Sequence, residues 1–502
     1  MTFGVLIDQT GNNAEFSWIS VAELAVLQMN EALQAEGGYK NFRFALNVQN
    51  SENDVAGGYD SRAMGRLRDI AASGAFGSIV DTTQVSEESN KPINGPALGL
   101  VMQCSSCTGG SFLNATSTVA DNPDLQASRR NADHWMQRTI MNTGSLAIVV
   151  AQMIYGMPNH GDLNGDGIIK LAAFASDESF GQSTSLAAIT ELKKKFTAQE
   201  LIDKVRFERV LHVNANDLRE IPFAAHLEQL NNSTNENMPP SSATFGATNI
   251  NAHLFGTAFE SQVTDGAPDL IAEATFARNG VQFVTDFKTQ YPGSSTKIIH
   301  FHTFRFSSNL LPLGELAEGE FGASHAIIDG EPGEMFKAAF KEQYGLLPVY
   351  RDSIYYDNAV TMMLATLIAL SPGHPGYNPD LPATGITGAM VKEVFPCTST
   401  NAARLITTRP ELVCPEGAPE PIVPSVDGFR LAVRTIAAGL PIEYTGASGP
   451  IDYDALGNVK GKVASYQVVN GTYEDTALFD CIASATCACT EGIVNECPDQ
   501  TP

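Results

Sequence analysis

The stretch that decides the fold runs from Ile442 to Glu474 and reads IEYTGASGPIDYDALGNVKGKVASYQVVNGTYE. It follows an apolar helix pattern, residues 429–438, which ends at the helix-terminating residues Gly439 and Pro441. Residues 446–450 are too rich in glycine to be helical, and a turn at residues 454–458 leads into the alternating residues 464–469. The sequence therefore predicts a helix, an extended segment, a turn and a strand, in that order.

Within this stretch, the pattern Y-x-G-x-S-G-x-I-D-Y-D-x-x-G-N resembles the third crossover of type 1 periplasmic binding proteins. These are the branched-chain-amino-acid type solute receptors of ABC importers. Other segments resemble the same family in chain order along nearly the whole sequence. They are residues 10–11, 49–54, 76–83, 98–106, 135–139, 169–181, 267–271 and 356–360.

The resemblance implies an α/β fold of two Rossmann-like lobes, with parallel-rich sheets joined by three crossover strands. Repeated strand–helix alternation supports parallel sheets that are covered by helices. One lobe is expected to comprise residues 1–141 plus 328–451, and the other residues 142–327 plus 452–480. Residues 231–264 are polar and rich in turn residues, which predicts a surface insertion, and residues 481–502 are expected to form a cysteine-rich tail.

The composition is that of an acidic globular protein. Of 502 residues, 43% are hydrophobic and 17% are charged, and the net charge is −25. This charge argues against nucleic acid and anionic membrane surfaces as partners, because both require a surface rich in Lys and Arg. No apolar run reaches the roughly 18 residues that a membrane span needs. Residues 144–157 and 359–370 are therefore expected to be core helices.

Eight cysteines, an even number, fit an oxidising compartment. A zinc site from the last four cysteines lacks paired C-x2-C knuckles, and a redox role for the C-x-x-C motif at residues 104–107 lacks a thioredoxin-type context. We expect disulfides instead. They are a bridge between Cys397 and Cys414, a local bridge between Cys104 and Cys107, and bridges that involve Cys481, Cys487, Cys489 and Cys497.

The resemblance also implies export, to the periplasm or the outside of the cell. Because Met1 stands directly before the first predicted strand, we expect that a signal peptide, with or without a lipid anchor, has been removed.

In the family, hydroxyl and main-chain N–H groups after the third and fourth strands hold the carboxylate of the ligand. The matching residues here are Thr82, Thr83, Ser105, Ser106 and Thr108. An aromatic residue of the second lobe packs on the ligand, and Phe180 matches it.

Further ligand contacts in the second lobe are expected after the next two strands. The first group of candidates is Glu273, Thr275 and Phe276, and the second is His302. The acid that meets the ligand's ammonium in the family would fall within residues 300–304 and is missing. Either Glu273 or Asp81 replaces it, or the ligand is not an α-amino acid; an aromatic carboxylate, a short peptide or an amide would fit as well.

Asp162, Asn164 and Asp166 form a D-x-N-x-D-G motif, the first half of a calcium loop. The twelfth position, which normally supplies a bidentate Glu, is Ala173, and a strand pattern follows instead of a helix. Two interpretations stay open: a structural calcium site completed by a distant carboxylate, or a turn that enters a strand.

His300 and His302 form an H-x-H pattern on a predicted strand, whose alternation would put both on one face. They are the basis of an alternative function, a metal-dependent hydrolase. No G-x-S-x-G, H-E-x-x-H or P-loop motif is present.

The sequence as a whole predicts a non-catalytic, extracytoplasmic solute-binding receptor of an ABC importer. It would bind an amino acid or a similar small carboxylate or amide metabolite in the cleft between two lobes, and present it to permease subunits in the membrane. We expect a monomer without a cofactor. A second alternative is a ligand-sensing receptor ectodomain of the same fold.

Overall fold

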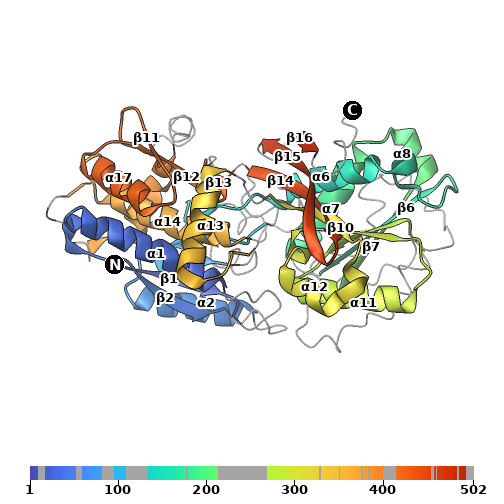
Figure 1. Cartoon of the computed structure of the whole chain (residues 1–502), viewed down its shortest axis with the longest axis horizontal. Helices are drawn as coiled ribbons and strands as arrows, with labels where there is room; N and C mark the ends of the chain where they lie inside the picture. The colour runs from blue at the N-terminus through green and yellow to red at the C-terminus, as the bar shows by residue number, and fades with distance from the viewer. Residues whose placement is uncertain are drawn as a thin grey trace. The chain divides into compact units, whose positions relative to one another are not determined.

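The computed structural model divides the chain into two compact units (Figure 1). Unit 1 comprises Met1–Asn53, Gly57–Met141 and Ile327–Gly461, and unit 2 comprises Asp54–Ala56, Asn142–Ala326 and Lys462–Pro502. The chain passes from unit 1 to unit 2 for the last time after Gly461, whereas the sequence analysis expected this boundary after residue 451. The segment between these two positions is held by unit 1. The backbone N–H of Arg138 donates to the carbonyl of Gly457 at 2.9 Å.

The structure describes most of the chain. The described residues are 1–9, 17–51, 59–81, 95–108, 134–176, 179–212, 268–326, 330–349, 351–374, 377–378, 380, 382, 385–399, 414–453, 457–459, 461–482 and 486–492. The predicted insertion, residues 231–264, lies outside them.

Unit 1 is built on a five-stranded sheet in the order β2-β1-β3-β4-β5, and all of its pairings are parallel. The central strands β1, β3 and β4 are short, mostly buried and mainly apolar, as expected for strands that are covered on both faces, whereas the edge strand β2 is partly exposed. The strands are β1 (Thr2–Ile7), β2 (Ala45–Asn50), β3 (Gly77–Val80), β4 (Val101–Cys104) and β5 (Met136–Arg138).

The helices of unit 1 come from both ends of the chain. Figure 1 shows α1 beside α14 and α17, and these helices contact one another. Helix α14 is the centre of the core, because nearly all of its side chains are buried. Among the helices that the structure describes, none is long and apolar enough to cross a membrane. The helices are α1 (Ser17–Ala35), α2 (Tyr59–Ala72), α4 (Gly95–Leu98), α13 (Glu331–Tyr344), α14 (Asp352–Ala369), α15 (Gly388–Val394) and α17 (Val426–Ala437).

The motif that decides the fold surrounds a buried carboxylate of α14. Strand β12 (Ile442–Gly446) pairs with β11 (Glu420–Ile422) and β13 (Gly449–Pro450). Asp357 accepts hydrogen bonds from the Tyr444 hydroxyl (2.7 Å), the Ala447 N–H (2.8 Å), and the N–H and hydroxyl of Ser448 (2.7 and 2.5 Å). Residue 446 must be glycine, because a Cβ there would lie 2.4 Å from Asp357 Oδ2. The motif therefore encodes a structural junction.

Unit 2 contains an eight-stranded sheet in the order β16-β15-β14-β10-β9-β8-β6-β7. Strands β6 to β10 are parallel to their neighbours, and β14 pairs antiparallel with β10. The core stacks Phe174 of β6 on Phe283 of α11, with ring centroids 4.1 Å apart. The strands are β6 (Ile169–Ser176), β7 (Val205–His212), β8 (Leu270–Ala274), β9 (Lys297–His300), β10 (Phe321–His325), β14 (Gly461–Val469), β15 (Thr472–Ile482) and β16 (Thr486–Gly492).

Helix α6 of unit 2 precedes its first strand, β6, and the other helices lie between successive parallel strands. The helices of this unit are α6 (Thr143–Tyr155), α7 (Ser179–Lys193), α8 (Ala198–Lys204), α11 (Ala277–Gln290) and α12 (Ser307–Leu313). The two apolar runs that the sequence analysis assigned to core helices lie in α6 and α14, and both helices are buried along most of their length.

Disulfides link the predicted pairs Cys104–Cys107 and Cys397–Cys414, and a third joins Cys481 to Cys487. Cys489 also forms a disulfide. The described residues of the expected cysteine-rich tail, 481–482 and 486–492, belong to β15 and β16. These two strands pair antiparallel and are part of the eight-stranded sheet, so this part of the tail has regular structure.

Candidate ligand-binding site

The strand order of unit 1 locates its candidate site. The order β2-β1-β3-β4-β5 reverses direction between β1 and β3. In open parallel sheets, ligands bind at the carboxyl ends of the strands beside this reversal. Asp8, Ser51, Asp81 and Ser105 directly follow β1, β2, β3 and β4, so these strand ends form the first candidate surface.

Two buried carboxyl groups lie at the reversal itself. The backbone N–H of Asp8 donates to the carboxyl group of Asp81, and the Ser51 hydroxyl donates to the same oxygen at 3.3 Å. Burial, and then the negative charge of Asp8, raise the pKa of Asp81 to about 8. This raised pKa favours the protonated form of the Asp81 carboxyl group, which makes it a weak candidate for binding a ligand ammonium.

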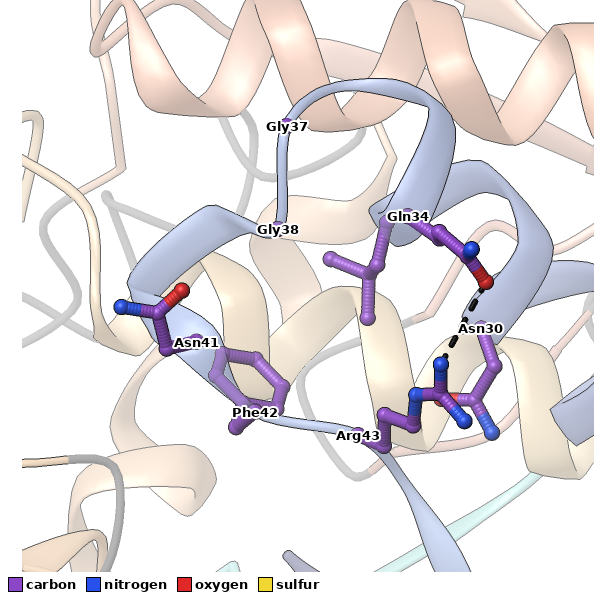
Figure 2. A pocket seen from close by; sticks show the side chains of 8 residues that line it. Asn30, Gln34, Gly37, Gly38, Asn41, Phe42 and Arg43 are labelled. Carbon is purple, nitrogen blue, oxygen red and sulfur yellow. Dashed lines mark hydrogen bonds between the residues drawn. The ribbon is translucent and has the colours of Figure 1, made fainter.

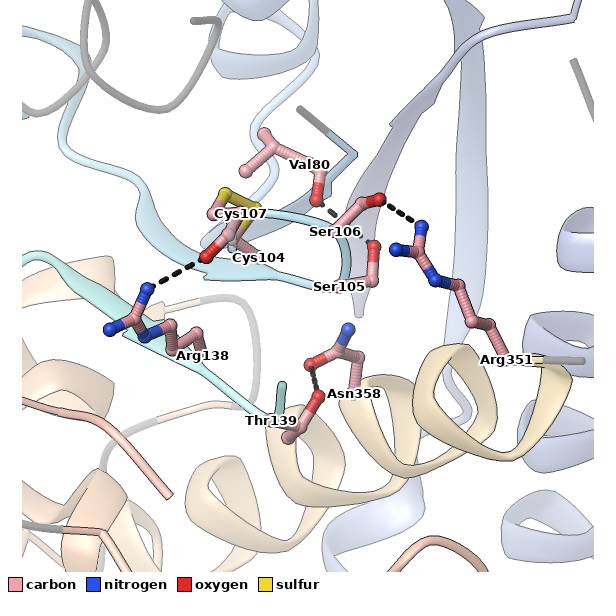
Figure 3. The surroundings of a disulfide bond; sticks show 9 residues. All are labelled: Val80, Cys104, Ser105, Ser106, Cys107, Arg138, Thr139, Arg351 and Asn358. Carbon is pink, nitrogen blue, oxygen red and sulfur yellow. Dashed lines mark hydrogen bonds between the residues drawn. A yellow bond between two sulfur atoms is a disulfide. The ribbon is translucent and has the colours of Figure 1, made fainter. Parts of the chain in front are cut away.

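The loop after β4 is fixed on three sides (Figure 3). The disulfide between Cys104 and Cys107 closes a small ring that contains Ser105 and Ser106. The Ser105 hydroxyl donates to the Val80 carbonyl at 3.1 Å, and Arg138 Nη1 donates to the Cys107 carbonyl at 2.8 Å. This loop is therefore held by β3, β5 and its own disulfide.

A buried arginine that the sequence analysis missed lies against this loop. Arg351 Nη1 donates to the Ser106 hydroxyl at 2.6 Å, and the residue is only 3% exposed. It precedes α14 with a φ of 73°, in the left-handed region. The sequence contains one indication of this role: Arg351 is a basic residue shortly before a predicted core helix, in a chain in which only 17% of the residues are charged.

The predicted hydroxyls of unit 1 differ in how accessible they are. Ser105 and Thr108 are fully buried, whereas Ser106 is partly exposed. The Thr108 N–H donates to the Ser106 carbonyl at 2.9 Å, which keeps this turn closed. Thr82 and Thr83 lie outside the described residues. Ser106 is therefore the candidate ligand donor that this part of the structure favours.

Three predicted residues of unit 2 lie together at the strand ends. The Phe180 ring lies 5.7 Å from Phe276 and 5.3 Å from His302, measured between centroids. His302 in turn lies 5.1 Å from His325, which ends β10 and was not predicted. All four side chains are buried. They form an aromatic cluster suited to the apolar body of a small molecule.

Glu273, another predicted residue of unit 2, has both carboxylate oxygens engaged within this unit. Oε1 accepts from the N–H of Thr275 at 2.8 Å and from the hydroxyl of the same residue. Oε2 contacts His300 Nδ1 at 3.0 Å. Glu273 therefore holds the turn that leads to Phe276, and these bonds leave it poorly placed to meet an ammonium group.

The prediction that His300 and His302 share one strand face is wrong. Strand β9 ends at His300, and His302 begins a 3-10 turn, η4 (His302–Phe304), in which Arg305 N–H donates to the His302 carbonyl. His300 contacts Glu273 through Nδ1 and Glu320 through Nε2, at 3.0 and 2.7 Å. Both ring nitrogens are used, so His300 is unsuited to binding a metal.

The oxygens of the predicted calcium loop accept hydrogen bonds from the backbone. Asp162 accepts from Gly165 N at 2.8 Å and Gly167 N at 3.0 Å. Asn164 accepts from the Asp166 N–H at 2.8 Å, and Asp166 also pairs with Lys170 Nζ at 2.9 Å. Among the described residues, no group of three or more His, Cys, Asp or Glu side chains is placed to hold a metal. This geometry favours a turn.

Solved structures match nearly the whole chain, whereas no protein-family model and no curated protein sequence does. A leucine-binding protein from Thermotoga maritima aligns over 95% of this chain and 98% of its own, with 13% identity and a TM-score of 0.55. An ABC-transporter solute-binding protein from Rhodopseudomonas palustris, in complex with 3,4-dihydroxybenzoic acid, aligns over 97% and 98%, with 14% identity and a TM-score of 0.57.

A third similar structure is the branched-chain amino acid transporter substrate-binding protein of Streptococcus pneumoniae in complex with isoleucine. It aligns over 94% of this chain and 97% of its own, with 10% identity and a TM-score of 0.57. The chain has the fold of the type 1 periplasmic binding proteins. The fold predicted from the sequence is thereby confirmed.

Figure 2 shows a surface pocket on unit 1, which lies at the opposite end of strand β1 from the candidate ligand loops. It has a volume of about 580 Å³, and its lining includes Asn30, Gln34, Phe42 and Arg43. The Met1 ammonium donates to the Arg43 carbonyl, which places the pocket at the amino end of β1. Within the pocket, the Gln34 side-chain oxygen accepts a hydrogen bond from the Arg43 guanidinium at 3.3 Å, so these two polar lining side chains bond each other.

Proposed function

We propose that this chain is a non-catalytic, extracytoplasmic solute-binding receptor of an ABC importer. The observation that carries the proposal is the whole-length likeness of its fold to solute-binding proteins of ABC transporters. The polar loop of unit 1 and the aromatic cluster of unit 2 both lie at carboxyl ends of parallel strands, which is where α/β sheets bind ligands.

The ligand that fits these two surfaces is a small carboxylate or amide with an apolar body. In unit 1, the hydroxyl of Ser106 would donate to the anionic end, and the positive charge of Arg351 beside it favours an anion. In unit 2, Phe180, Phe276 and His302 would contact the apolar part. Isoleucine and 3,4-dihydroxybenzoic acid, bound in two of the similar structures, share this chemistry. The roles of Thr82, Thr83, Ser105, Thr108 and Glu273 stay predictions.

Export to the periplasm or the cell exterior is part of the proposal. The disulfides, and the absence of a free cysteine from the described residues, support an oxidising compartment. The partners would be the permease subunits of the importer. An anchoring lipid and a monomeric state are expectations from the family resemblance.

A ligand screen tests the proposal. The thermal unfolding of the purified chain would be followed with L-leucine, L-isoleucine, 3,4-dihydroxybenzoate and benzoate, each in large excess. A compound at one hundred times its Kd stabilises the folded state by about 2.7 kcal/mol. We expect at least one carboxylate to raise the melting temperature, and its methyl ester, which lacks the carboxylate charge, to act less. If all four leave the melting temperature unchanged, carboxylates of the leucine and benzoate type are excluded as ligands.

A further inference from the structure

Four charged side chains of unit 2 form a continuous chain of contacts. Glu273 of β8 contacts His300 at the end of β9 at 3.0 Å, and His300 contacts Glu320, just before β10, at 2.7 Å. Lys288 of α11 forms an ion pair with the other oxygen of Glu320. The His300 side chain is fully buried, whereas that of Lys288 is 29% exposed. The chain therefore runs from the interior toward the surface.

The inner end of this charge chain holds the aromatic part of the candidate site. Glu273 accepts from both the N–H and the hydroxyl of Thr275. The next residue is Phe276, which begins the turn into α11 and packs against Phe180. The orientation of this turn thus depends on where the Glu273 carboxylate lies.

With both carboxylates ionised, the geometry favours a His300 that carries two protons. Each ring nitrogen faces a carboxylate, and a neutral imidazole would direct a lone pair at one of them. With a doubly protonated ring, the charges alternate along Glu273, His300, Glu320 and Lys288. Burial lowers the pKa of His300, but its hydrogen bonds to Glu273 and Glu320 outweigh burial and raise the pKa above its ordinary value.

The other groups around His300 do not replace these contacts. The Phe304 ring stacks on the imidazole at 3.6 Å between centroids. Arg305, on the same segment, pairs with Asp475 of β15 at 2.6 Å and donates to Ser324 of β10. Among the described residues, Glu273 and Glu320 are therefore the acids that contact the His300 ring.

We propose that this charge chain positions the turn that carries Phe276, and that ligand binding consequently requires the doubly protonated form of His300. The proposal rests on the function proposed above. Loss of one proton leaves a carboxylate facing a lone pair, which pushes Glu273 or Glu320 from its place. Because folding around two carboxylates stabilises the protonated form of His300, positioning is complete at neutral pH and is lost as the pH rises through the transition of His300.

The test compares wild type with Glu320→Gln, which removes one carboxylate without touching the aromatic cluster. Glu318→Gln is the matched control, because Glu318 is exposed and, among the described contacts, its side chain bonds only to the backbone N–H groups of residues 470 and 471.

The resonance of the His300 imidazole carbon would be followed by NMR between pH 6 and 10, and it would be assigned by its loss in His300→Gln. The protection factor of the Thr275 amide and the calorimetric affinities for L-isoleucine and 3,4-dihydroxybenzoate would be measured over the same range.

We expect Glu320→Gln to lower the transition of His300 by about one pH unit or more, and Glu318→Gln to leave it in place. In wild type, Thr275 protection and the affinity for whichever probe binds should fall about tenfold across the transition. An unchanged transition in Glu320→Gln, or Thr275 protection that does not follow the wild-type transition, would overturn the proposal. If neither probe binds, the proposed function is at fault, and NMR and exchange still decide on the charge chain.

Discussion

At the scale of single residues, the loop of Asp162 shows how backbone N–H groups can use the oxygens that calcium would need. Asp162 accepts two such hydrogen bonds, and Asn164 and Asp166 accept one each. Burial raises the pKa of Asp166, but hydrogen bonds from Lys170 and Ile168 outweigh it and hold the pKa below its ordinary value. The nearby ammonium of Lys170 neutralises part of the charge that would attract a cation.

We therefore expect EDTA to leave the melting temperature unchanged. Asp162→Ala should lower the free energy of unfolding by about 1–3 kcal/mol with or without calcium, because two partly buried N–H groups lose their acceptor. Calorimetric melts of both proteins with EDTA and with added calcium provide the measurement. A decrease with EDTA that calcium reverses, and that is absent from Asp166→Ala, would establish the calcium site, which is one of the two interpretations that the sequence leaves open.

Residue-scale prediction selected loops at the strand ends, but it did not predict the contacts within them. The resemblance selected Ser105 and Ser106 together, whereas the structure gives the first hydroxyl to Val80 and the second to Arg351. Arg351 and His325 come from segments far away in the sequence, and no local pattern reports which strand end they approach. The packing of the fold decides this.

At the scale of elements, the junction between α14 and β12 depends on one carboxylate. Burial raises the pKa of Asp357 to about 6, although it accepts hydrogen bonds from Ser448, Tyr444 and Ala447. Asp357→Ala would leave these donors without their acceptor, at a cost of about 3 kcal/mol or more. We expect this variant to unfold at a clearly lower urea concentration than wild type.

The matched control is Thr445→Ala, because Thr445 lies on the same strand and is only partly buried. Its effect on the free energy of unfolding should stay within about 0.5 kcal/mol. If Asp357→Ala and Thr445→Ala unfold at the same urea concentration, the junction does not depend on the carboxylate.

Element prediction succeeded where apolar runs are continuous and failed where polar residues interrupt them. The buried strands β1 and β6 and the apolar parts of α6 and α14 were all expected. Strand β15 was missed, because Glu474, Asp475 and Asp480 mask its alternation. The turn before it, Asn470 and Gly471, has φ values of 52° and 71°, and Asn-Gly is a strong hairpin signal that could have revealed the strand.

At the scale of the whole molecule, the fold persists at 10–14% identity to the similar structures. The motif most similar to the family fixes buried backbone and one carboxylate, and it leaves the side chains at the strand ends free to differ. The sequence could therefore specify the fold more sharply than the ligand, whose contacts depend on residues such as Arg351 and His325.

Titration calorimetry is the most direct test of the proposed binding mode. In this mode, Ser106 bonds the anionic end of the ligand and Phe180 contacts its apolar part. The tightest-binding carboxylate of the screen would be titrated into wild type, Ser106→Ala, Phe180→Ala and Ser105→Ala. Loss of a hydrogen bond to a charged group costs about 1.5–3 kcal/mol, so Ser106→Ala should weaken binding about ten- to a hundredfold. Phe180→Ala should also weaken binding, through lost packing, and Ser105→Ala should have a smaller effect than Ser106→Ala. Wild-type affinity in both Ser106→Ala and Phe180→Ala would contradict this binding mode.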